Sequence, residues 1–485
     1  MKYVILLEKD TRAQAEIKEA LRKINQDFQV LSFQKLEELA NWVNELIKDG
    51  VANTLGKNGD DSPMVPLMIL ERDQLGRNKN QLLTQMRSLF IRRGLCTFQD
   101  PVGCILTSFD NFDLDRKDIE DPSITNIIFK PFDKLILEEH LKLAAAGIKV
   151  ESKGGDLFHM QAKSKVEMLK DIELVSFCEY GFVTKTEEPV TEGRISKYYS
   201  TLFEINRTNY AYGECVYNQK VKDKNYYLSY FQFVAMETPF INHMRKVVMK
   251  AAKIPFNLPY YSKKTTPTRV RQWAMDDDKR DKISAMLKEF VQFLPCSIVT
   301  KEEAQAVSSV APTDLLVVLK EDYAHVRTFA EPSQIIVISF DKIDEDFLRE
   351  AEGAMDVITL LADRMYIKSK VKFLSSRNTE MPWELVQKSE SIQSGNPVDV
   401  VEVSESGIFI TYAKPMKIGT FRKFLMLLDK EATNTPFTAT CNSIKKNEKG
   451  EYVHHFVFFG MTDAYLKRIR LWIRNTFIEK KQDTP

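Results

Sequence analysis

The sequence predicts a multidomain α/β + β protein in which two parallel-sheet domains alternate with two small antiparallel β-barrels. Three observations predict it: the chain repeats itself, one part of each repeat alternates strands with helices, and the other part has short alternating strands. With 485 residues, of which 44% are apolar, the chain can fill four cores of ordinary size.

The repeat appears at a shift of about 226 positions. Glycine, proline and cysteine number only 18, 18 and 6 residues, so their recurrence in one register marks a duplication rather than chance. The matched pairs are Gly181 with Gly407, Pro189 with Pro415, Gly193 with Gly419, Cys215 with Cys441 and, upstream, Ser108 with Ser339 and Asp133 with Asp363. We therefore expect four domains in the order A–B–A′–B′, at residues 1–147, 156–253, 266–373 and 380–480.

The first A domain reads as alternating strands and helices. Strands are predicted at 4–7, 65–70, 102–107 and 125–129, and Thr11 is predicted to cap a helix that follows the first strand. This alternation predicts a five-stranded parallel sheet, whose ligand sites lie where the strands end. The residues at those ends are Glu8, Asp10, Glu71, Thr107 and Lys130.

That constellation resembles the receiver domain of bacterial response regulators, a flavodoxin-like fold. The resemblance implies an acidic cluster for Mg²⁺ at Glu8 and Asp10, a phosphoryl acceptor at Glu71, and phosphoryl contacts from Thr107 and Lys130. Glu71 departs from the family's aspartate, and Lys9 stands where a second acidic residue belongs. The pocket is therefore expected to be vestigial. Glu71 is either paired with Lys130 in imitation of the phosphorylated state or a surface carboxylate near a lysine.

The second A domain departs further from the pattern. Its aspartates, Asp276 to Asp278, read as a helix start that favours negative charge. The acceptor position falls on Leu319 or Lys320, and the lysine position is Leu360. Without an acceptor or a lysine this copy is expected to be a pseudo-receiver.

Both B domains read as short strands that close with one amphipathic helix. In the second copy the strands are expected at 398–403, 407–412, 421–429, 437–444 and 453–460. The stretches 254–268 and 375–397 are expected to be a linker and an irregular zone.

The positions Glu402, Ser404 and Gly407 are similar to the motif of PilZ domains, barrels that bind cyclic di-GMP. The resemblance implies a ligand site there, but PilZ domains that bind the nucleotide also carry two arginines four residues apart. No arginine lies between Arg116 and Arg194 or between Arg377 and Arg422. Since lysine replaces a bidentate guanidinium poorly, cyclic di-GMP binding is not expected.

Composition argues against nucleic-acid binding, membrane insertion and a metal site. A net charge of +1 gives no basic excess for nucleic acid, and the apolar run at 3–7 is too short for membrane insertion. The scattered cysteines and histidines show no metal-ligand spacing, and His140 and His325 read as surface residues. We expect a cytoplasmic protein without a metal or cofactor.

These observations predict a non-enzymatic bacterial signalling scaffold or adaptor that binds other proteins, in cyclic di-GMP-linked control of motility or surface behaviour. Two alternatives stay open: a cyclic di-GMP effector with a non-standard site at Glu402, Ser404 and Gly407, and a receiver-type regulator gated at the first domain. No nucleophile–base pair or phosphate loop points to an enzyme.

Overall fold

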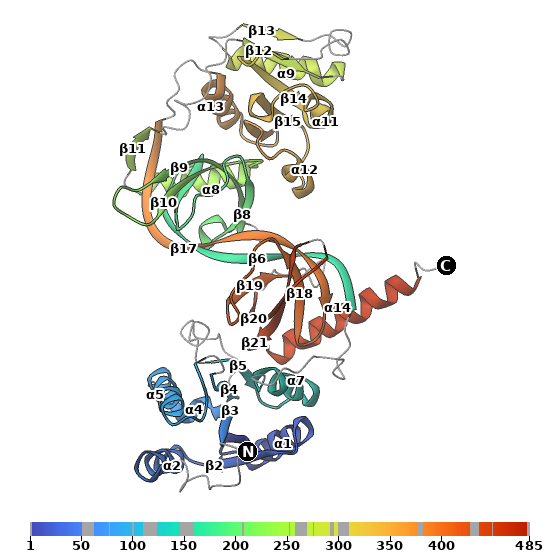
Figure 1. Ribbon diagram of the computed structural model, residues 1–485. Helices are drawn as coiled ribbons and strands as arrows, with labels where there is room; N and C mark the ends of the chain where they lie inside the picture. Colours follow the sequence, from blue (N-terminus) through green and yellow to red (C-terminus); the bar gives the residue numbers. More distant parts are fainter. Residues whose placement is uncertain are drawn as a thin grey trace. The chain divides into compact units, whose positions relative to one another are not determined.

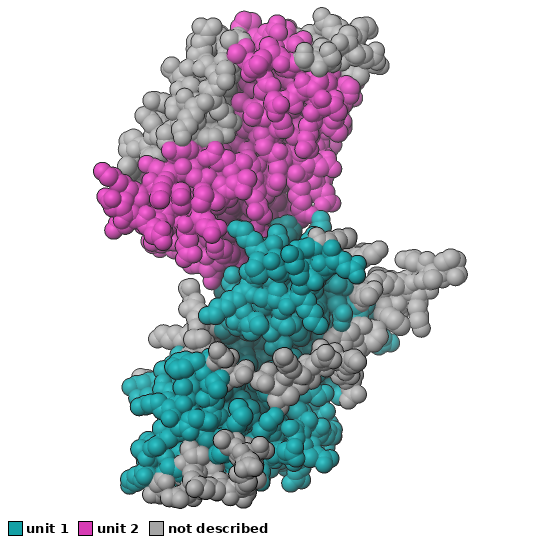
Figure 2. All heavy atoms as spheres, in the orientation of Figure 1, with its two compact units in different colours: residues 1–168, 397–485 teal, residues 169–396 magenta. Residues whose placement is uncertain are grey.

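The computed structural model describes most of the chain, namely residues 2–50, 63–76, 78–98, 101–109, 124–145, 160–205, 208–251, 253–257, 269–274, 276–291, 295–298, 310–375, 382–426, 436–448 and 450–482. These residues form two compact units (Figure 2). Unit 1 comprises residues 1–168 and 397–485, and unit 2 comprises residues 169–396. Each unit therefore joins a parallel-sheet domain from one half of the chain to antiparallel strands from the other half.

The first parallel sheet has the order β2-β1-β3-β4-β5. Its strands are β1 (Lys2–Leu7), β2 (Phe28–Phe33), β3 (Met64–Glu71), β4 (Gly103–Ser108) and β5 (Asn126–Phe129). Helices α1 (Thr11–Ile24) and α7 (Lys134–Ala144) pack on one face of this sheet. Helices α2 (Leu36–Asp49) and α5 (Lys79–Arg92) pack on the other, and α4 (Arg72–Leu75) follows β3. The predicted strands are confirmed to within two residues, whereas β2 was not predicted.

The second parallel sheet repeats this order, as β13-β12-β14-β15-β16. Its strands are β12 (Arg269–Trp273), β13 (Cys296–Ile298), β14 (Asp314–Leu319), β15 (Ile335–Ser339) and β16 (Asp356–Thr359). The helices are α9 (Asp277–Phe290), α11 (Tyr323–Val326), α12 (Glu345–Glu350) and α13 (Arg364–Ser375). The order 2-1-3-4-5 is one of the common doubly wound orders, in which ligands bind beyond the carboxyl ends of the strands.

The remaining strands belong to one antiparallel sheet, in which eleven strands follow the order β11-β17-β18-β21-β20-β19-β6-β7-β10-β9-β8. In the first half they are β6 (Met160–Phe177), β7 (Gly181–Thr186), β8 (Ile195–Tyr199), β9 (Tyr210–Lys220), β10 (Tyr227–Phe233) and β11 (Lys253–Asn257). In the second half they are β17 (Pro382–Val403), β18 (Gly407–Tyr412), β19 (Phe421–Leu425), β20 (Phe437–Lys446) and β21 (Tyr452–Phe459). Helices α8 (Thr238–Met249) and α14 (Asp463–Gln482) follow β10 and β21.

Two further pairings, β17 with β6 and β17 with β8, close this sheet into two six-stranded rings. One ring is β6-β7-β10-β9-β8-β17 and the other is β17-β18-β21-β20-β19-β6, so the long strands β6 and β17 belong to both (Figure 1). Closing a ring removes the exposed edges that an open antiparallel sheet would present. Each repeat therefore supplies its first strand to the ring of the other repeat.

Strand β17 corrects one prediction. Residues 375–397 were expected to be irregular, but β17 begins at Pro382 and runs through most of that stretch. Polar residues such as Gln387 and Ser394 hide the strand pattern, since half of its side chains face away from the core. The predicted linker at 254–268 begins with β11, which pairs with β17, and residues 258–268 lie outside the described residues.

The duplication is visible in matching backbone geometry. Gly193 and Gly419 have φ angles of 82° and 84°, and both amides donate to the matched cysteine carbonyls, Cys215 and Cys441, over 2.7 Å. Positive φ favours glycine, because it lacks the Cβ that would clash there. Among the described residues, no helix is long and apolar enough to cross a membrane.

Candidate functional site

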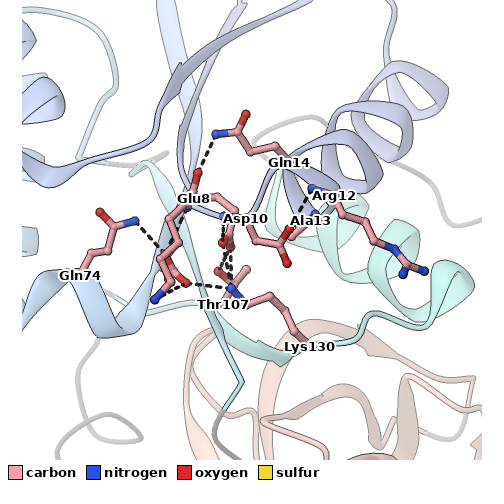
Figure 3. A network of polar contacts seen from close by, with 10 residues as sticks. Glu8, Asp10, Arg12, Ala13, Gln14, Gln74, Thr107 and Lys130 are labelled. Atoms are coloured by element: carbon pink, nitrogen blue, oxygen red, sulfur yellow. Dashed lines mark hydrogen bonds and ion pairs between the residues drawn. The ribbon is translucent and has the colours of Figure 1, made fainter.

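The residues predicted at the strand ends of the first parallel sheet do meet there, with one exception. Glu8 follows β1, Glu71 and Thr107 lie at the ends of β3 and β4, and Lys130 follows β5. The side chains of Glu8, Glu71 and Thr107 are fully buried, and Lys130 is 4% exposed. Parallel strands bring their carboxyl ends to one edge, and here that edge holds a buried charged network (Figure 3).

Lys130 is the centre of this network. Its Nζ lies 2.9 and 3.1 Å from the two carboxylate oxygens of Glu8 and 3.0 Å from Oε1 of Glu71. The hydroxyl of Thr107 donates to Glu8 Oε2 over 2.9 Å. The ammonium thus bridges both carboxylates directly, which matches the predicted pairing of Glu71 with Lys130 rather than a surface carboxylate.

Further donors complete the shell of Glu71. Gln74 Nε2 donates to Oε2 over 2.7 Å, and the amide of Lys9 donates to the same oxygen over 3.2 Å. Burial alone would raise the pKa of Glu71, but the hydrogen bonds from Gln74, Lys130 and Lys9 outweigh it and hold the pKa below its usual value. Glu71 therefore stays ionised and bound to donors.

Asp10 is the exception, because its side chain caps helix α1 instead of entering the network. Its Oδ1 accepts hydrogen bonds from the amides of Arg12 and Ala13 at 2.9 and 3.4 Å. The N-cap residue is thus Asp10, and the predicted cap Thr11 is the first residue of the helix. Only the backbone amide of Asp10 reaches the network, by donating to Glu8 Oε1.

This geometry limits the chemistry of the edge. A divalent cation needs several free oxygen ligands, and the oxygens of Glu8 and Glu71 already accept from lysine, threonine, glutamine and backbone donors. Among the described residues, no group of three or more His, Cys, Asp or Glu side chains could hold a metal. The arrangement can hold two carboxylates and one ammonium in fixed positions.

Among the residues that the structure describes, the second parallel sheet has no comparable network at its matched positions. Asp276 caps α9 by accepting from the Lys279 amide over 3.0 Å, and Asp277 and Asp278 occupy the first turn. The predicted helix start is confirmed. Ser339 donates to the carbonyl of Asp341 over 3.0 Å, and Lys320 pairs with Asp344 over 2.6 Å.

The motif residues Ser404 and Gly407 have clear structural roles in the turn between β17 and β18. Ser404 Oγ accepts from the amides of Ser406 and Gly407 at 3.3 and 3.2 Å, and its side chain is buried. A Cβ on Gly407 would lie 2.3 Å from the carbonyl oxygen of Phe456 on β21, so only glycine fits there. Glu402 lies on β17 opposite Phe409.

The first copy keeps the same turn with different side chains. The amide of Cys178 donates to the carbonyl of Gly181 over 2.8 Å, as Ser404 does to Gly407 over 2.9 Å. Cys178 is buried, and burial raises the pKa of its thiol to about 12. The thiol is therefore uncharged at neutral pH and packs as a small apolar group.

One duplicated constellation was not predicted. In unit 1, Arg470 on α14 donates from Nε to Glu405 over 2.7 Å and from Nη2 to Asp133 over 2.8 Å. In unit 2, Arg245 on α8 donates in the same way to Glu179 over 3.0 Å and to Asp363 over 3.1 Å. Each arginine joins the turn of its own barrel to the N-cap aspartate of a helix in the parallel-sheet domain. The signal was present in the matched numbering, since Glu179 and Arg245 recur at Glu405 and Arg470.

A buried polar pair lies beside each arginine bridge and differs between the units. In unit 1, Asn126 Nδ2 lies 2.6 Å from His140 Nδ1 and donates to the Phe458 carbonyl over 3.0 Å. In unit 2, Lys370 Nζ lies 2.8 Å from Asp356 and donates to the Phe233 carbonyl over 2.7 Å. The prediction that His140 is a surface residue is wrong: it is 5% exposed, and burial lowers its pKa to about 4. His325 is exposed, as predicted.

Comparison with known proteins adds no assignment. A scan against protein-family models, a search of curated proteins and a search of solved structures each gave no match. The resemblances to receiver and PilZ domains therefore rest on the strand-end and turn residues alone.

Proposed function

We propose that the protein is a non-enzymatic bacterial signalling scaffold or adaptor, built from two degenerate receiver domains and two PilZ-like barrels, that acts by binding other proteins. The observation that supports it most is the buried bridge from Lys130 to both Glu8 and Glu71. An ammonium held in this position fills the edge where a receiver would hold Mg²⁺ and a phosphoryl group.

The network favours a fixed state over a chemical switch. Phosphorylating Glu71 would require a metal beside it and would break its bonds to Lys130, Gln74 and Lys9. Breaking a buried charge pair is costly, at roughly 3–5 kcal/mol, because the abandoned partner remains desolvated. In this proposal the salt bridge between Lys130 and Glu71 imitates the phosphorylated state permanently.

The barrel motif supports the same conclusion for cyclic di-GMP. Ser404 and Gly407 are explained by the turn and by the close approach of β21, without a ligand. Arg245 and Arg470 each bind two carboxylates, so neither guanidinium is available to clamp phosphates.

The test exposes the full chain to the ligands of both families. We expect no phosphoryl mass increase after incubation with acetyl phosphate and Mg²⁺, and no saturable heat on titration with cyclic di-GMP. Affinity capture from the source cell should recover the same partner protein with and without either ligand. A labile phosphoryl group on Glu71 would establish the gated-regulator alternative. Binding at micromolar cyclic di-GMP that is lost in Ser404→Trp would establish the effector alternative.

A further inference from the structure

A cavity of about 260 Å³ lies in unit 1, between the end of β5 and the start of α7 on one side and the start of α14 on the other. An engineered cavity of about 150 Å³ lined by Leu, Ile and Phe binds benzene, so this one has room for a larger molecule. Its apolar wall includes Ile136, Met461 and Leu466, which contact one another across the two domains.

The one neutral polar side chain in the lining is His140, and its tautomer follows from its neighbour. The amides of Ile127 and Gly460 donate to Asn126 Oδ1 over 2.8 and 3.2 Å, which fixes Nδ2 as the donor end. Nδ2 must then donate to His140 Nδ1, which carries no proton. The ring proton of His140 therefore sits on Nε2.

That Nε2–H group has no hydrogen-bond partner among the residues that the structure describes. His140 is 5% exposed and lines the cavity, and its Nε2 is not fully buried. A hydrogen-bond acceptor on a molecule bound in the cavity would therefore meet a donor here.

The charged groups of the lining are already neutralised. Lys130 is bound to Glu8 and Glu71, and Asp133 is bound to Arg470. Asp463, at the rim, pairs with Lys467 over 2.6 Å. A charged ligand would find no free counter-charge here, whereas an uncharged one would lose little on entering.

We propose that this cavity binds a small, uncharged, largely apolar molecule that carries one hydrogen-bond acceptor, such as a carbonyl oxygen, directed at His140 Nε2. The site joins the two domains of unit 1 and borders the network around Lys130, whose side chain is part of the lining. It does not depend on the proposed adaptor role, because it concerns a different ligand and different atoms.

Acetophenone is a suitable probe, since it is an aromatic ring with one carbonyl acceptor. Ethylbenzene has a similar shape without the acceptor, and benzoate adds a charge. Binding can be followed in the full chain by the methyl NMR signal of Met461, assigned with Met461→Leu. The buried Met355 of unit 2 serves as an internal reference.

We expect acetophenone at millimolar concentration to shift the Met461 signal and leave Met355 unchanged. Ethylbenzene should bind roughly three- to tenfold more weakly, the range for one lost hydrogen bond, and benzoate should not bind. In His140→Phe, which keeps a ring but removes the donor, acetophenone should bind only as well as ethylbenzene does. Leu471→Ala, an exposed change on α14, should leave all three results unaltered.

Two outcomes would overturn the proposal. One is an unchanged Met461 signal with acetophenone in the wild-type chain, a measurement that needs no variant to fold. The other is equal affinity for acetophenone and ethylbenzene, which would show that His140 donates to neither.

Discussion

Units 1 and 2 are assembled from matched parts, yet they treat their buried charges differently. Both join a barrel to a parallel sheet through one arginine that holds a barrel glutamate and a helix-capping aspartate. Unit 1 then uses the neutral pair Asn126 and His140 at the junction and concentrates its buried charge at Lys130. Unit 2 has the charged pair Asp356 and Lys370 at the junction and an apolar Leu360 at the sheet edge.

Features that both units share are those that the duplicated architecture requires. The arginine bridge occurs in both copies, so it belongs to the docking of barrel on sheet. The glycine turns also recur in both copies. Within the described parts of the two sheets, the network at the sheet edge occurs in one copy only, so the fold does not depend on it. The docking contact also crosses the repeats, because Arg470 and Asp133 come from opposite halves of the chain.

The largest effect is expected from Lys130→Met, which leaves two buried carboxylates without their ammonium. We expect unit 1 to lose about 3–5 kcal/mol of stability at neutral pH, since an abandoned buried charge remains desolvated. The loss should shrink in acid, where protonated carboxyl groups need no counter-charge. Hydrogen exchange of peptides from β1 and β3 would measure it, with β12 and β14 as the unaffected reference.

Lys9→Met is the matched control for that change. Lys9 Nζ lies 3.5 Å from Glu71 but its side chain is 58% exposed, so the loss should stay under about 1 kcal/mol. Equal losses for Lys9 and Lys130 would contradict the central role of the buried ammonium.

A second test converts one junction into the other. Lys370→Met leaves Asp356 buried and unpaired, and we expect unit 2 to lose about 3 kcal/mol or more, by exchange of peptides from β12 and β16. The double change Asp356→Asn with Lys370→His recreates the neutral pair of unit 1 and should recover most of that stability. If the double variant is no better than the single one, the two junctions are not equivalent.

The neutral junction of unit 1 should make that unit the more acid-sensitive of the two. Burial lowers the pKa of His140 from 6.5 to about 4, so the unfolded chain takes up a proton at higher pH than the folded one. The stabilisation is complete above pH 6.5 and is lost as the pH falls toward 4. It amounts to about 3 kcal/mol over that window.

Hydrogen exchange in unit 1, measured between pH 7 and pH 4, tests this prediction. In His140→Phe, the stability of unit 1 should depend less steeply on pH. Some slope should remain, because burial also lowers the pKa of His454 in the same unit. His325→Phe, a change at an exposed histidine, should leave the slope unchanged. An unaltered slope in His140→Phe would place the acid sensitivity elsewhere.

The sequence predicted strands and the residues at their ends well, but it did not predict which distant segments pack or pair with one another. Apolar runs predicted β1, β3 and β18, and the strand-end rule brought Glu8, Glu71 and Lys130 together. The burial of His140 was not predicted, because it depends on residues 457–460, which are distant in the sequence. No local pattern around His140 reveals that contact. The exchange of β6 and β17 was missed for the same reason, since strand patterns show faces but not partners.

The smallest expected effects concern the arginine bridges, and they test the comparison most directly. Arg470→Met and Arg245→Met each remove a partly exposed guanidinium with two carboxylate partners, so we expect losses of about 1 kcal/mol in units 1 and 2 respectively. The test compares the loss of stability in unit 1 with that in unit 2. Hydrogen exchange of peptides from α7 and α13 measures the two losses. The exposed pair of Lys134 with Glu19 provides a control through Lys134→Met, which should cost less than either bridge. A clear loss in only one unit would mean that, in the other unit, different contacts hold the antiparallel strands against the parallel sheet. The arginine bridge of that unit would then be retained from the duplication without being required for stability.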